Sequence, residues 1–319
     1  NALKTYPDYS YLLKIKIEMD IDNDQYQNAI DAANILLKND PKNAYILQKK
    51  SFALSLLNRS KEALEVIDQS LNVDPGDNIS LFIKSVILYD LERYDEALNN
   101  IEKVIETDSN LIFVNRKVQY LLKLKKFDET IEVIKNIQNR EDYPDFMNEF
   151  SFALIEANIA LGNNKVSLQE IKKLEPMITN SPADEIMRFA YLSFTQAIEE
   201  FKSGNQENGK KLIKLIYQIE EECPDKKIDI KSATIEFLKN LIELGDVQII
   251  DSAINQIIMC KNDSYRWFIK PLTDALEIIK TGDIRIYYKD MQSEEREIVA
   301  DIIKKITKSD ELFPKNSLN

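Results

Sequence analysis

Small side chains recur at a fixed interval in the first part of the chain. Ala29, Ala63 and Ala97 are evenly spaced, and Thr130 takes the next place with a slip of one residue. A small residue is needed where two helices cross closely, because a larger side chain would push their backbones apart. The interval, about 34 residues, is typical of a repeat in which each unit is one pair of antiparallel helices. The spacing therefore predicts stacked helical hairpins.

Other residues keep the same register. The position three residues before each small residue is filled by Tyr26, Ser60, Tyr94 and Phe127. Two Asp-Pro pairs, Asp40-Pro41 and Asp74-Pro75, are separated by the same interval. We expect each Asp to cap a helix and each Pro to occupy its first position, where the missing amide hydrogen costs nothing.

The region 10–137 resembles four tetratricopeptide repeats that start near Ser10, Ala44, Asn78 and Leu111. The second repeat matches the family pattern of large and small residues best, at Leu47, Ser51, Leu54, Ala63, Ile67, Ser70 and Pro75. Two features depart from the pattern: Thr130 stands at a small position, and only the first two repeats end in Pro. The resemblance implies an all-α fold, a right-handed superhelical solenoid of antiparallel helix pairs.

Weaker hairpin signals continue beyond Arg140. Gly162, Gly204 and Gly245 each stand between two helical patterns, and a small or slim residue follows five positions later at Ser167, Gly209 and Ile250. These signals predict divergent hairpins over 143–176, 182–221 and 229–261. We divide the chain into repeats over 1–140, divergent hairpins continuous with them over 141–262, and a C-terminal helical pair with a capping helix over 263–319.

The last predicted helix starts at Ser293, where the acids that follow favour a helix start. Its expected apolar stripe consists of Ile298, Val299, Ile302, Ile303 and Ile306. A final helix that is half apolar and half charged is what the end of a solenoid needs for solubility. No element is assigned to residues 284–291, where apolar and polar residues alternate.

Composition disfavours several classes of function. The net charge of −12 makes a nucleic acid an unsuitable partner, and no apolar run reaches the roughly 20 residues of a membrane span. The two cysteines in so large a chain indicate free thiols in a reducing compartment, hence a cytoplasmic location. The chain has no histidine, the commonest general base. We therefore expect no enzyme activity and no cofactor.

Three short motifs suggest ligand sites but lack essential parts. The run from Gly204 to Lys211 resembles a phosphate-binding loop, but it lacks the closing hydroxyl residue and follows a predicted helix rather than a strand. The acids at Asp20, Asp22 and Asp24 resemble a calcium loop without its turn glycine. Cys223 and Cys260 lack the further ligands of a zinc site. We assign no metal to any of them.

The family resemblance implies a binding groove lined by the first helix of each pair. Mapping the groove positions onto this chain gives a row that includes Ile79 and Ile112 and is rich in aromatic and apolar residues. From this row, together with Arg116 beside Asn115, we select as partner-binding residues Tyr11, Tyr45, Gln48, Phe52, Phe82, Val86, Tyr89, Asn115, Arg116 and Gln119. Phe52 and Val86 stand where some members of the family carry an asparagine that clamps a terminal carboxylate, so that specificity is not expected here.

These observations favour a protein-protein interaction scaffold or adaptor. Its partner would be a protein or an extended or helical peptide with apolar side chains, because exposed apolar patches on water-soluble proteins mark binding sites. The alternative is that a neighbouring copy in a homo-oligomer, or the chain's own last helix, fills the groove. The alternative function is a regulatory or substrate-recruiting helical domain of a larger enzyme or complex.

Overall fold

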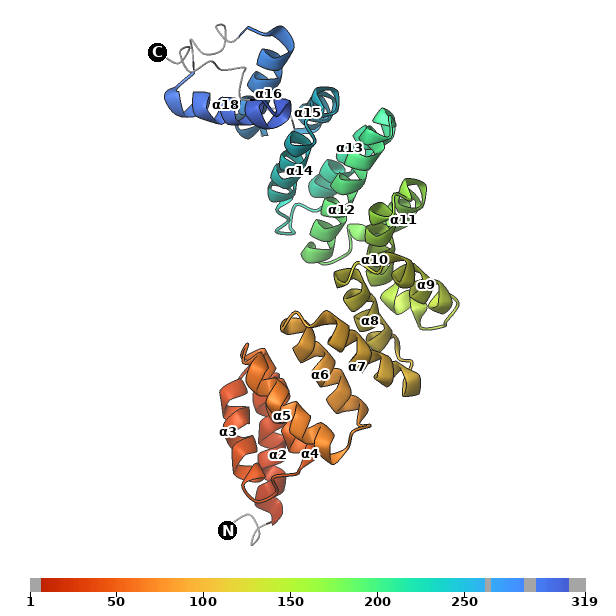
Figure 1. Ribbon diagram of the computed structural model, residues 1–319, viewed down its shortest axis with the longest axis vertical. Coiled ribbons are helices and arrows are strands. Elements are labelled where there is room, and N and C mark those ends of the chain that lie inside the picture. The colour runs from red at the N-terminus through yellow and green to blue at the C-terminus, as the bar shows by residue number, and fades with distance from the viewer. Residues whose placement is uncertain (1–6, 262–264, 284–290, 310–319) are drawn as a thin grey trace. The chain divides into compact units, whose positions relative to one another are not determined.

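The structure is a computed structural model that describes residues 7–261, 265–283 and 291–309. These residues form α-helices and the short 3-10 helix η1 (Tyr143–Phe146), without any strand (Figure 1). The prediction of an all-α fold of helix pairs is confirmed. Internal contacts divide the chain into two compact units, Asn1–Ala153 and Leu154–Asn319. The division into three parts stays a prediction. None of the described helices is both long and apolar enough to cross a membrane.

Unit 1 consists of four helical pairs in the predicted register. The first helices of the pairs are α2 (Pro7–Asp22), α4 (Ala44–Leu56), α6 (Asn78–Asp90) and α8 (Leu111–Lys123). The second helices are α3 (Tyr26–Leu37), α5 (Ser60–Val73), α7 (Tyr94–Thr107) and α9 (Phe127–Ile137). Every second helix thus begins at the residue three positions before the small residue, as the spacing predicts.

The small residues lie buried at the helix crossings. Ala63 and Ala97 are completely buried, as is Thr130. The hydroxyl of Ser51 on α4 donates to the carbonyl oxygen of Ala63 on α5 at 2.8 Å, so the two backbones approach closely at this point. The predicted role of the repeating small residue is confirmed.

The predicted capping by the Asp-Pro pairs is wrong. Asp74 ends α5 instead of starting α6, and its carboxylate accepts a hydrogen bond from the Gly76 amide at 3.1 Å. The cap lies three residues later, where the Asp77 carboxylate accepts from the Ser80 amide at 2.7 Å. Asn43 caps α4 in the same way. Pro41 and Pro75 therefore lie in the turn before the helix, because a second Asx residue closer to the helix start takes the capping role.

Each pair in unit 1 is joined by the same tight turn. One residue per turn has a left-handed backbone, with φ of 59° at Asp24, 58° at Asn58, 59° at Glu92 and 57° at Lys125. In the second pair, Arg59 N donates to Leu54 O at 3.0 Å and Asn58 N donates to Ser55 O at 2.9 Å. These bonds form a Schellman motif, which satisfies the last free carbonyls of the helix.

Apart from the first half of their first helix, the hairpins predicted after Arg140 lie in unit 2. They are α10 (Met147–Ala160) with α11 (Asn164–Ile178), α12 (Ala183–Lys202) with α13 (Gln206–Glu222), and α14 (Ile230–Leu244) with α15 (Val247–Lys261). The boundary between the units falls within α10. Gly162, Gly204 and Gly245 have positive φ in the turns. Gly209 packs so closely on Phe201 that a Cβ would lie 2.8 Å from the ring, so its predicted role as a small residue is confirmed.

A further pair, α16 (Arg266–Thr281) and α18 (Ser293–Thr307), ends the described part of the chain. Gln292 and Glu295 form a capping box at the predicted helix start. Val299, Ile303 and Ile306 are buried, but Ile298 is exposed, so the prediction that it belongs to the buried stripe is wrong. Only a limited arc of a helix surface packs against the core, and Ile298 lies outside that arc. Residues 284–290, to which we assign no element, lie outside the described residues.

We expect Ala97→Leu to lower the free energy of unfolding by about 1–3 kcal/mol, because the added methyl groups overpack the crossing of α6 and α7. Urea unfolding followed by circular dichroism measures the loss. The matched control is Ala160→Leu, which adds the same atoms at an exposed helix end. Equal stability of the two variants would contradict close packing at Ala97.

Candidate functional site

The first helices of unit 1 form one continuous layer. α4 packs against both α2 and α6. α6 contacts α8 through the rings of Phe82 and Phe113, whose centroids lie 5.1 Å apart, and through Ser85, whose hydroxyl lies 3.3 Å from the Tyr120 hydroxyl. Residues that recur at the same position of successive first helices therefore share one surface, which we call the first-helix face.

Exposed apolar side chains line this face at one repeating position. Their exposed fractions are 65% at Tyr11, 37% at Tyr45, 59% at Ile79 and 51% at Ile112. The four residues follow one another at the same intervals as the small residues of the repeat, so they occupy equivalent places in the four pairs. Core packing does not explain why apolar side chains recur at an exposed position of every repeat. The selected site includes Tyr11 and Tyr45, and Ile79 and Ile112 extend the same row.

A second group lies further along the helices. Phe52 is exposed, whereas Val86 and Gln119 at the equivalent positions of α6 and α8 are half-buried. Leu56, one helical turn beyond Phe52, is exposed as well. The selection from sequence missed Leu56, although its spacing of four residues from Phe52 places both on one side of α4.

Polar contacts fix the orientation of Tyr45. Its hydroxyl donates to Glu18 Oε1 at 2.5 Å, and Lys49 Nζ lies 3.2 Å from the same oxygen and 5.4 Å from the Tyr45 ring centre. The hydrogen bond from Tyr45 is the main reason that the pKa of Glu18 is lowered. Burial and the Glu18 carboxylate raise the pKa of Tyr45 to about 12. An aromatic ring held in this way loses little conformational entropy on binding a partner.

Three of the selected residues take part in contacts between helices. Gln48 is only 7% exposed, and its amide nitrogen donates to Asp77 at 2.6 Å and to Ser80 at 3.1 Å, which ties α4 to α6. Phe82 packs on Phe113, and Tyr89 lies between Tyr94 and Tyr120. These three side chains contribute more to packing between helices than to the exposed surface of the first-helix face.

The end of the face at α8 is polar. Arg116 is exposed, and its Nη1 donates to Gln119 at 3.1 Å. Asn115 is half-buried. Burial raises the pKa of Asp90 at the end of α6, and the positive charge of Arg116 opposes this shift. This end of the face therefore presents a cation and amides beside the apolar row.

The motifs that resemble ligand sites have structural roles or lie apart. Gly204 is the turn residue between α12 and α13, and Gly209 packs on Phe201, so the run from Gly204 to Lys211 forms no phosphate-binding loop. Cys223 and Cys260 are free thiols. Within the described part of the chain, no group of three or more acidic or cysteine residues is arranged to hold a metal ion.

Comparison with known proteins agrees with this geometry. Residues 22–104 match the family model described as anaphase-promoting complex, cyclosome, subunit 3. The structure is similar to the C-terminal part of a TPR repeat-containing protein from Cytophaga hutchinsonii, with a TM-score of 0.57 and 15% identity, covering 79% of this chain and 96% of that one. A tetratricopeptide repeat protein from Parabacteroides merdae gives a TM-score of 0.50 and 13% identity, covering 77% and 98%. Curated proteins give no match.

These findings and the repeat register define a helical scaffold of stacked hairpins. The fold is of the tetratricopeptide-repeat type, with four regular helical pairs followed by divergent hairpins, and the matching family model covers residues 22–104 of it. The likeness to the two solved structures concerns the fold.

Replacing Glu18 by Gln should lower the pKa of Tyr45 from about 12 toward its ordinary value of 10.0, because the variant removes the negative charge beside the phenol. Carbon NMR of labelled tyrosine rings, titrated with base, measures this shift. Because folding raises this pKa, the stabilising contribution of the phenol is complete below pH 10 and disappears as the pH rises through 12. Glu62→Gln on α5 serves as the control, and an unchanged Tyr45 pKa in Glu18→Gln would disprove the contact.

Proposed function

We propose that the chain is a protein-interaction scaffold and that its first-helix face binds a partner segment with apolar side chains. The observation that carries the proposal is the row of Tyr11, Tyr45, Ile79 and Ile112, exposed at the same position of four successive helical pairs. Exposed apolar area in register is costly in water, and a partner that covers it recovers that free energy.

The row also limits the form of the partner. Its members lie on neighbouring helices that pack side by side, so the apolar contacts follow the stack and not a single helix. A segment that runs across the first helices contacts all four side chains. The rigid Tyr45 and the nearby Phe52 supply the aromatic area that dominates the free energy of many interfaces. Arg116 at the α8 end offers one partner for an acidic group of the same segment.

The double variant Phe52→Glu with Ile79→Glu tests this proposal. Both side chains are exposed, so the fold should persist, while two carboxylates on the apolar face should weaken binding by at least about tenfold. Affinity capture from the source cells with quantitative mass spectrometry selects partners that prefer the unchanged chain. Interferometry with each purified partner then measures the change in Kd.

The matched control is Val73→Glu with Val166→Glu, which adds the same charges at exposed apolar residues outside the first helices. Its partners should be retained within about twofold, a change that corresponds to less than about 0.5 kcal/mol. Partners that bind the first double variant as well as the unchanged chain would refute the role of the first-helix face. Light scattering separates this result from self-association, because a second copy on the face would give a dimer that the variant abolishes.

A further inference from the structure

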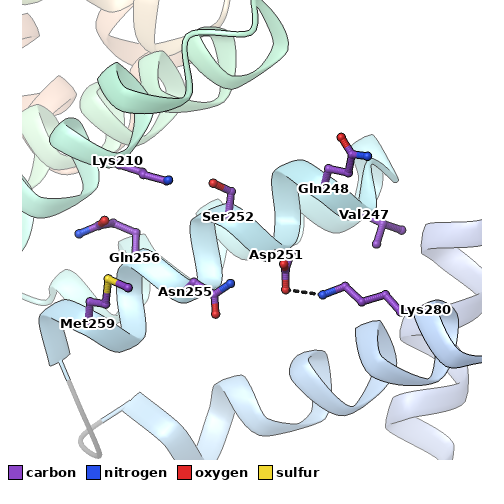
Figure 2. Close-up of a pocket in the computed structure, with 9 residues that line it drawn as sticks. All are labelled: Lys210, Val247, Gln248, Asp251, Ser252, Asn255, Gln256, Met259 and Lys280. Atoms are coloured by element: carbon purple, nitrogen blue, oxygen red, sulfur yellow. Dashed lines mark ion pairs between the residues drawn. The ribbon is translucent and has the colours of Figure 1, made fainter.

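The outward side of α15 in unit 2 carries few charges. Its residues recur at helical spacing and include Gln248, Ser252, Asn255, Gln256 and Met259 (Figure 2). The one carboxylate among them, Asp251, is paired with Lys280 on α16 at 2.7 Å. In a chain with 30% charged residues, this side of α15 has one charged residue, Asp251, among uncharged polar residues, Val247 and Met259. Depletion of charge together with exposed Met is typical of the centre of an interface.

This side of α15 forms the floor of an open cleft. A cavity of about 720 Å³ lies between α13 and α15 and reaches Lys280 on α16. A second cavity of about 370 Å³ adjoins it, shares Gln256 and Met259, and ends at Cys260. The two together follow α15, whose 15 residues correspond to a length of about 22 Å. We call this surface the α13–α15 cleft. It lies wholly within unit 2, and its helices are not those of the first-helix face.

The wall of the cleft on α13 carries two lysines, Lys210 and Lys214, that have no close carboxylate partner in the described part of the chain. Figure 2 shows Lys210 opposite Ser252 and Gln256 of α15. The carboxylate nearest to Lys210 is that of Glu207, at 3.9 Å on a strongly exposed side chain. Among the described residues Lys214 makes no ion pair. By contrast, Asp251 in the lining is paired with Lys280 at 2.7 Å. Glu221 lies 3.7 Å from Lys261, which is shared with Glu220 at 2.6 Å.

The floor of the cleft complements the backbone of a peptide. Each side-chain amide of Gln248, Asn255 and Gln256 carries both donors and an acceptor, and so can pair with the N–H and C=O groups of an extended chain. Met259 is 79% exposed and offers a flexible apolar contact at the end near Cys260. The available cations of Lys210 and Lys214 would then select carboxylate side chains, through charge-assisted hydrogen bonds.

From this arrangement we infer that the α13–α15 cleft binds an acidic peptide segment of a partner protein. Lys210 and Lys214 contact its carboxylates, the amides of α15 hold its backbone, and Met259 contacts an apolar side chain. The chain is acidic overall, so this local excess of available cations directs an acidic segment to one place on unit 2.

A displayed library of random twelve-residue peptides, selected on the immobilised full chain, tests the inference. We expect a class of peptides enriched in Asp and Glu, whose affinity in fluorescence polarisation falls at least tenfold for Lys210→Glu with Lys214→Glu. The control variant Lys227→Glu with Lys239→Glu changes the net charge equally at exposed residues of unit 2 outside the cleft and should retain affinity within twofold.

The two free thiols locate the bound peptide. A selected peptide with a terminal chloroacetyl group should alkylate Cys260, whose sulfur displaces chloride and forms a thioether, because Cys260 lines the end of the cleft. Cys223 is buried and should not react, and Cys260→Ser should abolish the product.

The inference is overturned if the acidic peptides bind the double lysine variant as tightly as the unchanged chain, or if no acidic class emerges. It is also overturned if those peptides depend on Phe52 and Ile79, which would assign them to the first-helix face and leave that proposal intact. A single-stranded oligonucleotide that binds through Lys210 and Lys214 more tightly than the peptides would assign the cleft to nucleic acid. A dimer abolished by the double lysine variant would assign it to a second copy.

Discussion

The close crossing of two helices at a small side chain is the constraint on which the structure depends. In unit 1 the crossings are made by alanines and Thr130, and in unit 2 Gly209 takes the same role. A Cβ at Gly209 would lie 2.8 Å from the Phe201 ring, so a larger residue at that point would require the ring to move. Because each pair closes in the same way, equivalent residues of successive first helices lie at equivalent places. The exposed apolar row follows from that regularity.

The fold could be predicted from the sequence because its determinants are local and recur. The small residue and the position three residues before it give the start of every second helix in unit 1. The same logic, with glycine at the turn, locates the hairpins of unit 2. Among the left-handed turn residues of unit 1, Asp24 and Asn58 are residue types that favour positive φ, but Glu92 and Lys125 are not. There the Schellman hydrogen bonds determine the backbone conformation.

The candidate sites could be predicted only in part, because burial depends on neighbouring repeats. The position of Gln48 predicts that it lies in the groove. Instead its amide donates to Asp77 and Ser80 of the next pair, so the side chain is buried between α4 and α6. Capping was assigned to Asp40 and Asp74, while Asn43 and Asp77 compete for the same role from a better position. The α13–α15 cleft was missed because the family resemblance directs attention to first helices. The sequence signal that indicates this cleft is a charge-poor stretch of α15 together with the lysines of α13.

The central claim is that the small residues lie inside the helix crossings in solution. Single cysteines at positions 63, 97 and 160, each introduced in a Cys223→Ser, Cys260→Ser background, report this through their rate of reaction with a soluble disulfide reagent. We predict that Ala63→Cys and Ala97→Cys react at least about a thousandfold more slowly than Ala160→Cys, because they react only after unfolding of their repeats. Comparable rates at all three positions would contradict the account.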